Sequence, residues 1–505
     1  MARDPLVLHG DRLTLAGILD VARRDRPVAL APEALARMRE ARGVVERHLA
    51  EDRPVYGLTT GLGPRVTERL DRAAMEAFSR QTVLGRANGV GPLLDRAASR
   101  AVMLIRANTL ALGGAGASPA IAEFLIATLN AGIHPIMPSI GSVGAADLCL
   151  MGHLGLLVIG EGEAAIGAKV LPALEALAGA GIAPLTLGPK DGLALCSSNA
   201  VSAALGALCL SDARAVFELA QLAAALTFEG FRANLSPLDP RIQAARPSPG
   251  QAEAASGLLR LLAESALNEP GAARRVQDPL SLRCVAPVHG ALLSALDFAA
   301  AALEPELNGA GDNPLVLVED GEILSNGNFH TTSLALAFDA LGLALTQSAQ
   351  ISAARIERML SATLTGLPAC LSPPAANGAG FAPASKTAQA LLAQIRGFAA
   401  PASIHVMGAG EGVEDDASNA PLAVSKTAEM LWRIRLVLSL ELMMGAQAVD
   451  LRGGLRLGRG PAIAHRLIRE IVPPLAADRP LGAEIDRLER ELLASGRLLA
   501  VVKAG

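Results

Sequence analysis

The chain alternates long apolar stretches, in which hydrophobic residues recur with helical spacing, with short polar loops rich in glycine. The apolar stretches dominate residues 190–450, and several of them run for about 20 residues or more. Helices that are apolar on nearly every side must be buried on most sides, so this region predicts a central helical bundle. The long helices predicted here are 199–229, 251–268, 289–307, 331–360 and 427–451.

The N-terminal region has a different pattern, in which short strands mix with shorter helices. Strand-like pieces at 6–8 and 28–30 flank the first segment, and an amphipathic helix is predicted at 32–50. Pro32 suits the first turn of that helix, because its missing N–H would have no partner there. The further helices predicted in this region are 69–84, a pair within 94–132 that is joined at 113–116, and one that begins near 148.

These patterns predict a mainly α protein with three consecutive parts. Residues 1–190 are expected to form a smaller N-terminal α+β part, and residues 191–455 the large central bundle of long helices. Residues 456–505 carry more charge, so they are expected to form peripheral C-terminal helices.

Composition narrows the classes of function. Of the 505 residues, 51% are hydrophobic and 19% are charged, which is enough apolar surface for a large core. A net charge of -4 argues against nucleic acid as a partner. The five cysteines stand singly and the eight histidines lack the spacing of metal ligands, so we expect no metal site.

The sequence also predicts neither a leader nor a membrane segment. The N-terminus has no basic head followed by an unbroken apolar run, as a signal peptide would. The best apolar runs, 153–160 and 436–444, fall far short of the ~20 uninterrupted residues that a spanning helix needs. We therefore expect a cytoplasmic protein without membrane partners.

Polar, glycine-rich loops interrupt the predicted helices at five places. Loops of this kind between buried helices indicate that the loops build a site while the helices hold it. They are 56–63, 141–148, 277–284, the pair 311–314 and 326–330, and 408–416.

The motifs in these loops, in this order and spacing, resemble those of the histidine, phenylalanine and tyrosine ammonia-lyase family. The resemblance extends over almost the whole chain. It is carried by residues 10–15, 56–57, 106–108, 141–145, 277–279, 281–284, 288–290, 312–314, 327–329, 401–405 and 478–482. It implies an ammonia-lyase (fumarase/aspartase-like) fold, a homotetramer with active sites made from loops of three subunits, and elimination of ammonia from an amino acid.

The resemblance also assigns roles to individual residues. Tyr56, the one tyrosine of the chain, matches the base, and Arg283 matches the residue that holds the substrate carboxylate by a bidentate pair. Asn313 and Phe329 match positions that frame the pocket, and Glu414 matches an acidic catalytic position in the fifth loop. Each has a purely structural alternative. These are a capped buried phenol, a helix-end ion pair, a turn-forming amide, a core aromatic and a solvated acidic face, respectively.

One loop departs from the family pattern at its chemical centre. Members make an electrophilic methylidene-imidazolone group from an Ala-Ser-Gly triplet, whereas this chain reads Ala145-Ala146-Asp147. Ala146 has no hydroxyl to lose as water, and no glycine nitrogen follows it to close the ring. The sequence therefore predicts a degenerate cofactor loop and no cofactor.

Three further positions differ from the family. Leu280 stands where members usually have a catalytic tyrosine, and Ser197 stands where they have an asparagine. Arg86 replaces the histidine or aromatic residue that reads the substrate side chain, which suggests a substrate with an acidic or strongly polar distal group. The base and the carboxylate anchor are present, so these changes indicate a site that binds a small carboxylate and moves a proton.

The leading hypothesis is a carbon–nitrogen lyase that acts on an amino acid or related small carboxylate by general-base elimination without the imidazolone. A second hypothesis is an isomerase or addition reaction on the same scaffold, since elimination and addition share a proton transfer. The third is a catalytically silent member that binds a small molecule or partners an active paralogue in a mixed tetramer.

Overall fold

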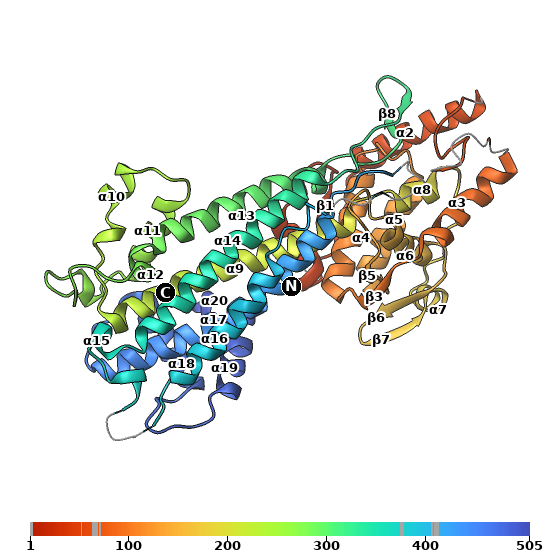
Figure 1. Cartoon of the computed structure of the whole chain (residues 1–505). Coiled ribbons are helices and arrows are strands. Elements are labelled where there is room, and N and C mark those ends of the chain that lie inside the picture. Colours follow the sequence, from red (N-terminus) through yellow and green to blue (C-terminus); the bar gives the residue numbers. More distant parts are fainter. Residues whose placement is uncertain are drawn as a thin grey trace. The chain divides into compact units, whose positions relative to one another are not determined.

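The structure, a computed structural model of the whole chain, describes residues 4–51, 53–62, 69, 72–373, 378–405, 408 and 414–504. Within these residues the protein is mainly helical, which confirms the expected fold class (Figure 1). The chain divides into two compact units, and each draws on three separate stretches of sequence. Unit 1 comprises Met1–Cys209, Ala300–Phe338 and Pro401–Ser425, and unit 2 comprises Leu210–Ala299, Asp339–Ala400 and Lys426–Gly505.

These units are not the three consecutive segments expected from the sequence, because four long helices run from one unit into the other. Those helices are α9 (Ala200–Phe231), α13 (Val285–Asn308), α14 (Thr332–Met359) and α17 (Ala420–Arg452). Each begins and ends within a few residues of its predicted position, except that α17 starts seven residues earlier than the predicted 427–451.

Unit 1 contains the remaining helices of the N-terminal region and all the strands of the described chain. Its helices are α1 (Leu15–Arg24), α2 (Pro32–Ala50), α3 (Arg72–Arg86), α4 (Arg96–Leu110), α5 (Pro119–Asn130), α6 (Leu148–Val158), α7 (Ala173–Gly179) and α8 (Asp191–Cys196). Its strands are β1 (Leu6–Leu8), β2 (Val28–Leu30), β3 (Val90–Leu93), β4 (Ile133–Pro135), β5 (Pro138–Ile140), β6 (Glu163–Ile166), β7 (Lys169–Pro172), β8 (Leu315–Leu317) and β9 (Glu322–Leu324).

Local chemistry explains several of these boundaries. Helix α2 begins at Pro32, as predicted, and α1 is capped by the Thr14 hydroxyl, which accepts a hydrogen bond from Gly17 N at 3.1 Å. Asp95 caps α4 in the same way, through Ala98 N at 2.7 Å. Strands β1 and β2 are the two strands that the sequence predicted. They pair in parallel, with Leu6 opposite Val28.

The sequence did not reveal the antiparallel sheet of β4, β6 and β7. Ala164 and Ala165 in β6 have little intrinsic preference for strands, and strands of four residues are too short to show a period of two. The β6–β7 hairpin depends on Gly167, which turns the chain with a positive φ of 59°.

Unit 2 contains the rest of the helices. They are α10 (Pro240–Ala245), α11 (Gln251–Leu261), α12 (Leu280–Arg283), α15 (Ala362–Thr365), α16 (Ala382–Phe398), α18 (Arg459–Ile471), α19 (Gly482–Leu488) and α20 (Arg497–Ala504). Within this unit, polar side chains link three of the long helices: Thr227 on α9 and Arg355 on α14 both bond to Glu441 on α17. The acceptor carboxylate is fully buried, so the core of unit 2 includes an ion pair.

Among the residues that the structure describes, three helical stretches are long and apolar enough to cross a membrane, contrary to the expectation that no such segment exists. They are Asp191–Phe231, Val285–Asn308 and Thr332–Met359. The apolar window of the first is 94% buried inside the structure, and those of the other two are 44% and 67% buried. The sequence-based search missed these stretches because scattered polar residues interrupt each run. The average hydropathy over a longer window is nevertheless high.

Candidate functional site

The loop at residues 141–148 lies at the centre of the candidate site in unit 1. Ala146 N donates to Phe329 O at 3.2 Å, and Asp147 N donates to Ser198 O at 2.8 Å. Ala145 forms an isolated antiparallel bridge with His330. Backbone bonds therefore bring Phe329 and the residues next to Ser197 against the predicted cofactor loop, although the sequence separates them widely.

The Asp147 carboxylate fixes this loop to the start of α9. It accepts hydrogen bonds from Ser202 N and Ser202 Oγ at 2.8 Å each, and from Ser142 Oγ at 2.7 Å. The side chain is fully buried, and this burial raises the pKa of Asp147, while the bonds from Ser202 and Ser142 lower it. Asp147 is therefore a structural anchor of the loop and not a group open to substrate.

Ala146 adopts a left-handed backbone conformation, with φ at +58°. A side chain with a β-carbon is strained there by about 1–2 kcal/mol, and glycine is not. We expect Ala146→Gly to raise the free energy of unfolding by about 1 kcal/mol, because relief of strain exceeds the added entropy of the unfolded chain. Denaturant titration of the two proteins at equal concentration measures the change.

The neighbouring residue gives the matched control. Ala145 has no positive φ, so Ala145→Gly should lower the free energy of unfolding by about 0.5–1 kcal/mol. Equal shifts of the same sign in both variants would contradict the interpretation of strain at Ala146.

Tyr56 lies in a turn that packs against α8. The Thr59 hydroxyl closes this turn, since it accepts from Val55 N at 2.8 Å and donates to Arg53 O at 2.7 Å. Gly57 has a positive φ of 65°, and a β-carbon on it would lie 2.5 Å from Leu193 on α8. The turn therefore holds the half-buried Tyr56 beside the helix that leads directly to Ser197.

Arg86 ends α3 and lies in the same region as two cysteines and Glu414. Burial raises the pKa of Cys149, with Arg86 opposing the shift and Glu414 adding to it, so both charges act on this thiol. Burial likewise raises the pKa of Cys196 to about 12, against the influence of Arg86. Two sequence-predicted residues, Arg86 and Glu414, therefore share one neighbourhood with Cys149, and Arg86 also acts on Cys196, the residue before Ser197.

Gly152 on α6 explains how Arg86 is placed there. A β-carbon at this position would lie 2.5 Å from Ala87 N and 2.5 Å from the carbonyl carbon of Arg86. The absence of a side chain lets α6 approach the backbone at the end of α3. Sequence analysis did not single out Gly152, Cys149 or Cys196. A glycine inside the otherwise apolar helix was the available signal.

Asn313 has the turn-forming role that was its structural alternative, at least for its oxygen. Its Oδ1 accepts hydrogen bonds from Asn326 N at 3.0 Å and Ser325 Oγ at 3.3 Å, and its peptide bond to Pro314 is cis. It thereby ties the two halves of the fourth loop together and supports the half-buried Phe329.

Arg283 and Leu280 belong to unit 2, whereas the other candidate residues belong to unit 1. Arg283 is half-buried at the end of α12, and its Nε donates to Asp278 O at 2.7 Å. Leu280 begins the same short helix with 63% of its surface exposed. In the predicted loops, residues 63 and 409–413 lie outside the described residues.

A family profile described as aromatic amino acid lyase matches residues 13–470. The chain belongs to the aromatic amino acid lyase family. It is 40% identical over 504 residues to a histidine ammonia-lyase of Gloeobacter violaceus, covering 99% of this chain and 98% of the relative. The family resemblance found in the sequence is confirmed, and the chain is related to carbon–nitrogen lyases over its whole length.

Solved structures of aromatic amino acid lyases and their relatives have the same fold. An ergothioneine-degrading ergothionase from Treponema denticola, in complex with desmethyl-ergothioneine sulfonic acid, has a TM-score of 0.95 at 33% identity and covers 98% of this chain and 100% of its own. A tyrosine aminomutase from Streptomyces globisporus has a TM-score of 0.93 at 31% identity, with 99% of both chains covered.

The comparisons correct the expectation that this lyase has no cofactor. Members of its family, including histidine ammonia-lyases like the relative above, carry the methylidene-imidazolone group, and a substituted triplet does not show that the group is absent. Residues 145–147 as they stand do not fit that group, because Ala146 offers no hydroxyl and Asp147 N is bonded to Ser198 O. The chemistry below is therefore derived from the chain's own side chains.

Proposed function

We propose that this chain is a carbon–nitrogen lyase that eliminates trimethylamine from an ergothioneine-type betaine, an imidazole amino acid whose nitrogen is quaternary. Two features support the proposal. The ergothionase of Treponema denticola matches the entire fold with a TM-score of 0.95. The observation that carries it is Ala146, which has no hydroxyl at the position where the family triplet has serine, whereas Tyr56 and Arg283 match the family's base and carboxylate anchor.

The leaving group decides which elimination these side chains can drive. In the proposed reaction the Tyr56 oxygen takes a proton from the β-carbon, and the electrons of that C–H bond form the Cα–Cβ double bond. The C–N bond breaks with its electron pair remaining on nitrogen. A quaternary ammonium leaves as neutral trimethylamine without a proton, whereas a plain amine leaves poorly. The other product is an imidazole acrylate.

The remaining residues bind and orient the substrate in this proposal. Arg283 pairs with the carboxylate in bidentate geometry, which aligns the C–N bond for elimination. Arg86 faces the far end of the substrate, where a thioimidazole sulfur carries partial negative charge. Phe329 packs on the imidazole ring. Glu414, whose charge acts with that of Arg86 on Cys149, balances the charge in that part of the site.

We further propose that the working enzyme is a cytoplasmic homotetramer. Tyr56 and Arg86 belong to unit 1, whereas Arg283 and Leu280 belong to unit 2 of the same chain. A homotetramer in which several subunits contribute loops would let one chain's Arg283 serve another chain's Tyr56. The 63% exposure of Leu280 in the isolated chain supports such an arrangement, because an apolar side chain of this size is stabilised by burial against a second subunit.

A substrate comparison tests the proposed function. Purified protein is incubated in parallel with ergothioneine, its sulfur-free betaine and histidine, and mass spectrometry identifies the amine and the acrylate. We expect kcat/KM for ergothioneine to exceed that for histidine by about 100-fold or more. Equal or faster turnover of histidine would instead support the ammonia-lyase activity named for the relatives at about 40% identity.

Arg86 has a matched control on its own helix. Arg86→Gln should erase most of the preference for the sulfur-bearing substrate. The control Arg80→Gln changes a residue six positions earlier on the same helix and removes its exposed ion pair with Glu161. It should leave the preference unchanged.

Turnover to a β-amino acid would favour the isomerase alternative, for which the aminomutase fold is the supporting observation. Binding without turnover would favour a silent member or a partner of an active paralogue.

A further inference from the structure

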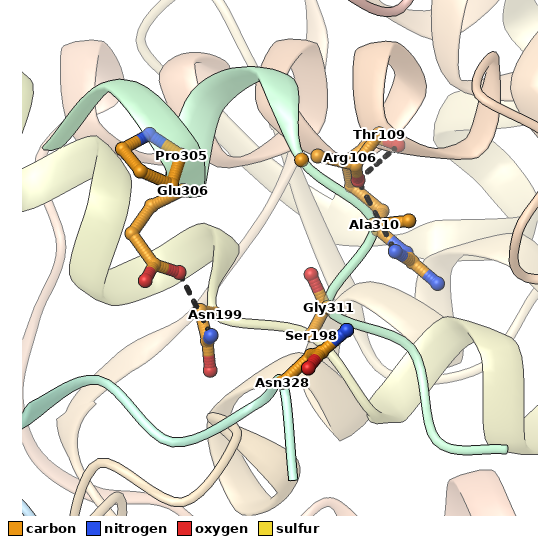
Figure 2. Close-up of a pocket in the computed structure, with 10 residues that line it drawn as sticks. Arg106, Thr109, Ser198, Asn199, Pro305, Glu306, Ala310, Gly311 and Asn328 are labelled. Atoms are coloured by element: carbon orange, nitrogen blue, oxygen red, sulfur yellow. Dashed lines mark hydrogen bonds between the residues drawn. The ribbon is translucent and has the colours of Figure 1, made fainter. Parts of the chain in front are cut away.

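A pocket of about 290 Å³ lies in unit 1, and the residues that line it are outside the set assigned to substrate (Figure 2). Ser198 and Asn328 line it, and both adjoin backbone bonds of the loop: Ser198 O accepts from Asp147 N, and the residue after Asn328 accepts from Ala146 N. Two residues of the pocket wall therefore adjoin the backbone bonds that hold the 141–148 loop.

The pocket presents hydrogen-bond acceptors on one side. Glu306 reaches from the last turn of α13 toward Asn199, whose Nδ2 donates to Glu306 Oε2 at 2.8 Å (Figure 2). That bond turns Asn199 Oδ1 away from Glu306. Asn199 is 8% exposed, and none of the described residues donates to its Oδ1. A buried acceptor without a donor costs free energy, so this atom indicates a ligand that carries N–H groups.

The charge around the pocket is that of a cation site. Burial raises the pKa of Glu306 to about 7, against the Asn199 hydrogen bond, and the nearby Asp147 raises it further. The C-terminal end of α13 contributes the partial negative charge of a helix terminus. Asp147 already occupies the N-terminal amides of α9, so that end offers little attraction to an anion.

The one cation in the pocket wall is already neutralised among the described residues. Arg106 is 1% exposed and pairs with Asp312 Oδ1 at 2.7 Å, and it also donates to Thr109 Oγ1 at 3.1 Å. Its charge is therefore balanced, although its Nε–H has no acceptor among the described residues. None of the described residues forms an ion pair with the Glu306 carboxylate in the pocket wall. A small cation in the pocket would offset the repulsion that Asp147 exerts on Glu306.

We infer that this pocket binds a small ammonium-type cation, the class of product that a carbon–nitrogen lyase releases. Glu306 and Asn199 Oδ1 are the acceptors, and the end of α13 adds a favourable field. The identification of the ligand as product rests on the proposed function. The preference for a cation rests on the pocket alone. A site whose wall adjoins the 141–148 loop can hold the released amine while the acrylate leaves.

Direct binding without substrate tests the inference separately from catalysis. Thermal unfolding is followed as ammonium chloride or trimethylammonium chloride replaces sodium chloride at constant ionic strength, at a pH above the pKa of Glu306. Ligands that bind the folded state raise the unfolding temperature by mass action. We expect at least one of the two ammonium salts to stabilise the wild-type protein more than sodium does.

Glu306→Gln should raise the half-saturating ammonium concentration by about tenfold or more, because the charge that faces the cation is lost. The matched control is Glu304→Gln, an exposed carboxylate two residues earlier on α13, which should respond as wild type. If Glu306→Gln fails to fold, Asn199→Ala tests the second acceptor with the same expected loss.

An undiminished response in the pocket variants, or equal stabilisation by sodium, would overturn the inference. Ammonium binding by a protein that turns over no substrate would support the pocket while removing the proposed function.

Discussion

Replacement of Tyr56 by phenylalanine is expected to lower kcat for the best substrate by about two to four orders of magnitude. The variant removes one oxygen and leaves the ring, so the packing of the turn against α8 should persist. Since the oxygen acts on the β-proton and not on binding, KM should change little. Steady-state kinetics of the two proteins on the same substrate measures both parameters.

The composition of the chain makes this experiment unusually direct. Tyr56 is the one tyrosine among 505 residues, so the ultraviolet absorbance of tyrosinate reports on a single group. If Tyr56 is the base, the pH dependence of kcat/KM should follow the tyrosinate titration of the free enzyme. The Tyr56→Phe protein is the control, since it should lack that titration. Full activity in Tyr56→Phe would eliminate the proposed mechanism.

The fold was largely predictable because its signal is strong and local. Helix α2 matches the predicted range 32–50, and α9, α13 and α14 match within four residues, because long apolar runs end at polar loops. The β6–β7 hairpin was missed because strands of four residues are too short to show a period of two, and two of the four residues of β6 are alanine. The division into units was also inaccessible, since it depends on contacts between segments far apart in the chain.

The candidate site was only partly predictable for the same reason. Motif order placed Tyr56, Asn313 and Phe329 in loops, but it could not show that Ala146 N bonds to Phe329 O. Glu306 was missed because a glutamate near the end of a helix resembles an exposed residue. The fold instead turns the Glu306 side chain toward Asn199, which donates a hydrogen bond to it. The expectation about the cofactor went wrong because it concluded an absence from three residues.

The loop that carries Arg283 depends on a buried ion pair in the core of unit 2. Arg355 and Glu441 are both fully buried, with Arg355 Nη2 donating to Glu441 Oε2 at 2.9 Å. Thr227 and Ser352 hydroxyls also donate to this carboxylate. Arg355 Nη1 in turn donates to Ser281 O at 3.3 Å, within the helix that ends at Arg283. The pair therefore links the stability of the bundle to the position of the proposed carboxylate anchor.

Arg355→Met is accordingly expected to lower the free energy of unfolding by about 3–5 kcal/mol, because Glu441 is left buried without its cation. The double variant Arg355→Met/Glu441→Leu should regain much of this loss, since an apolar pair of similar volume needs no charge compensation. Arg487→Met, which breaks the exposed pair with Glu491, should cost less than about 0.5 kcal/mol.

Trp432 is the single tryptophan and lies on α17 with Glu441, so its fluorescence follows unfolding by denaturant. A loss in Arg355→Met no larger than in the exposed control would show that the buried pair does not hold the core together. A stable Arg355→Met protein with a raised KM would instead locate its role in the Arg283 loop alone.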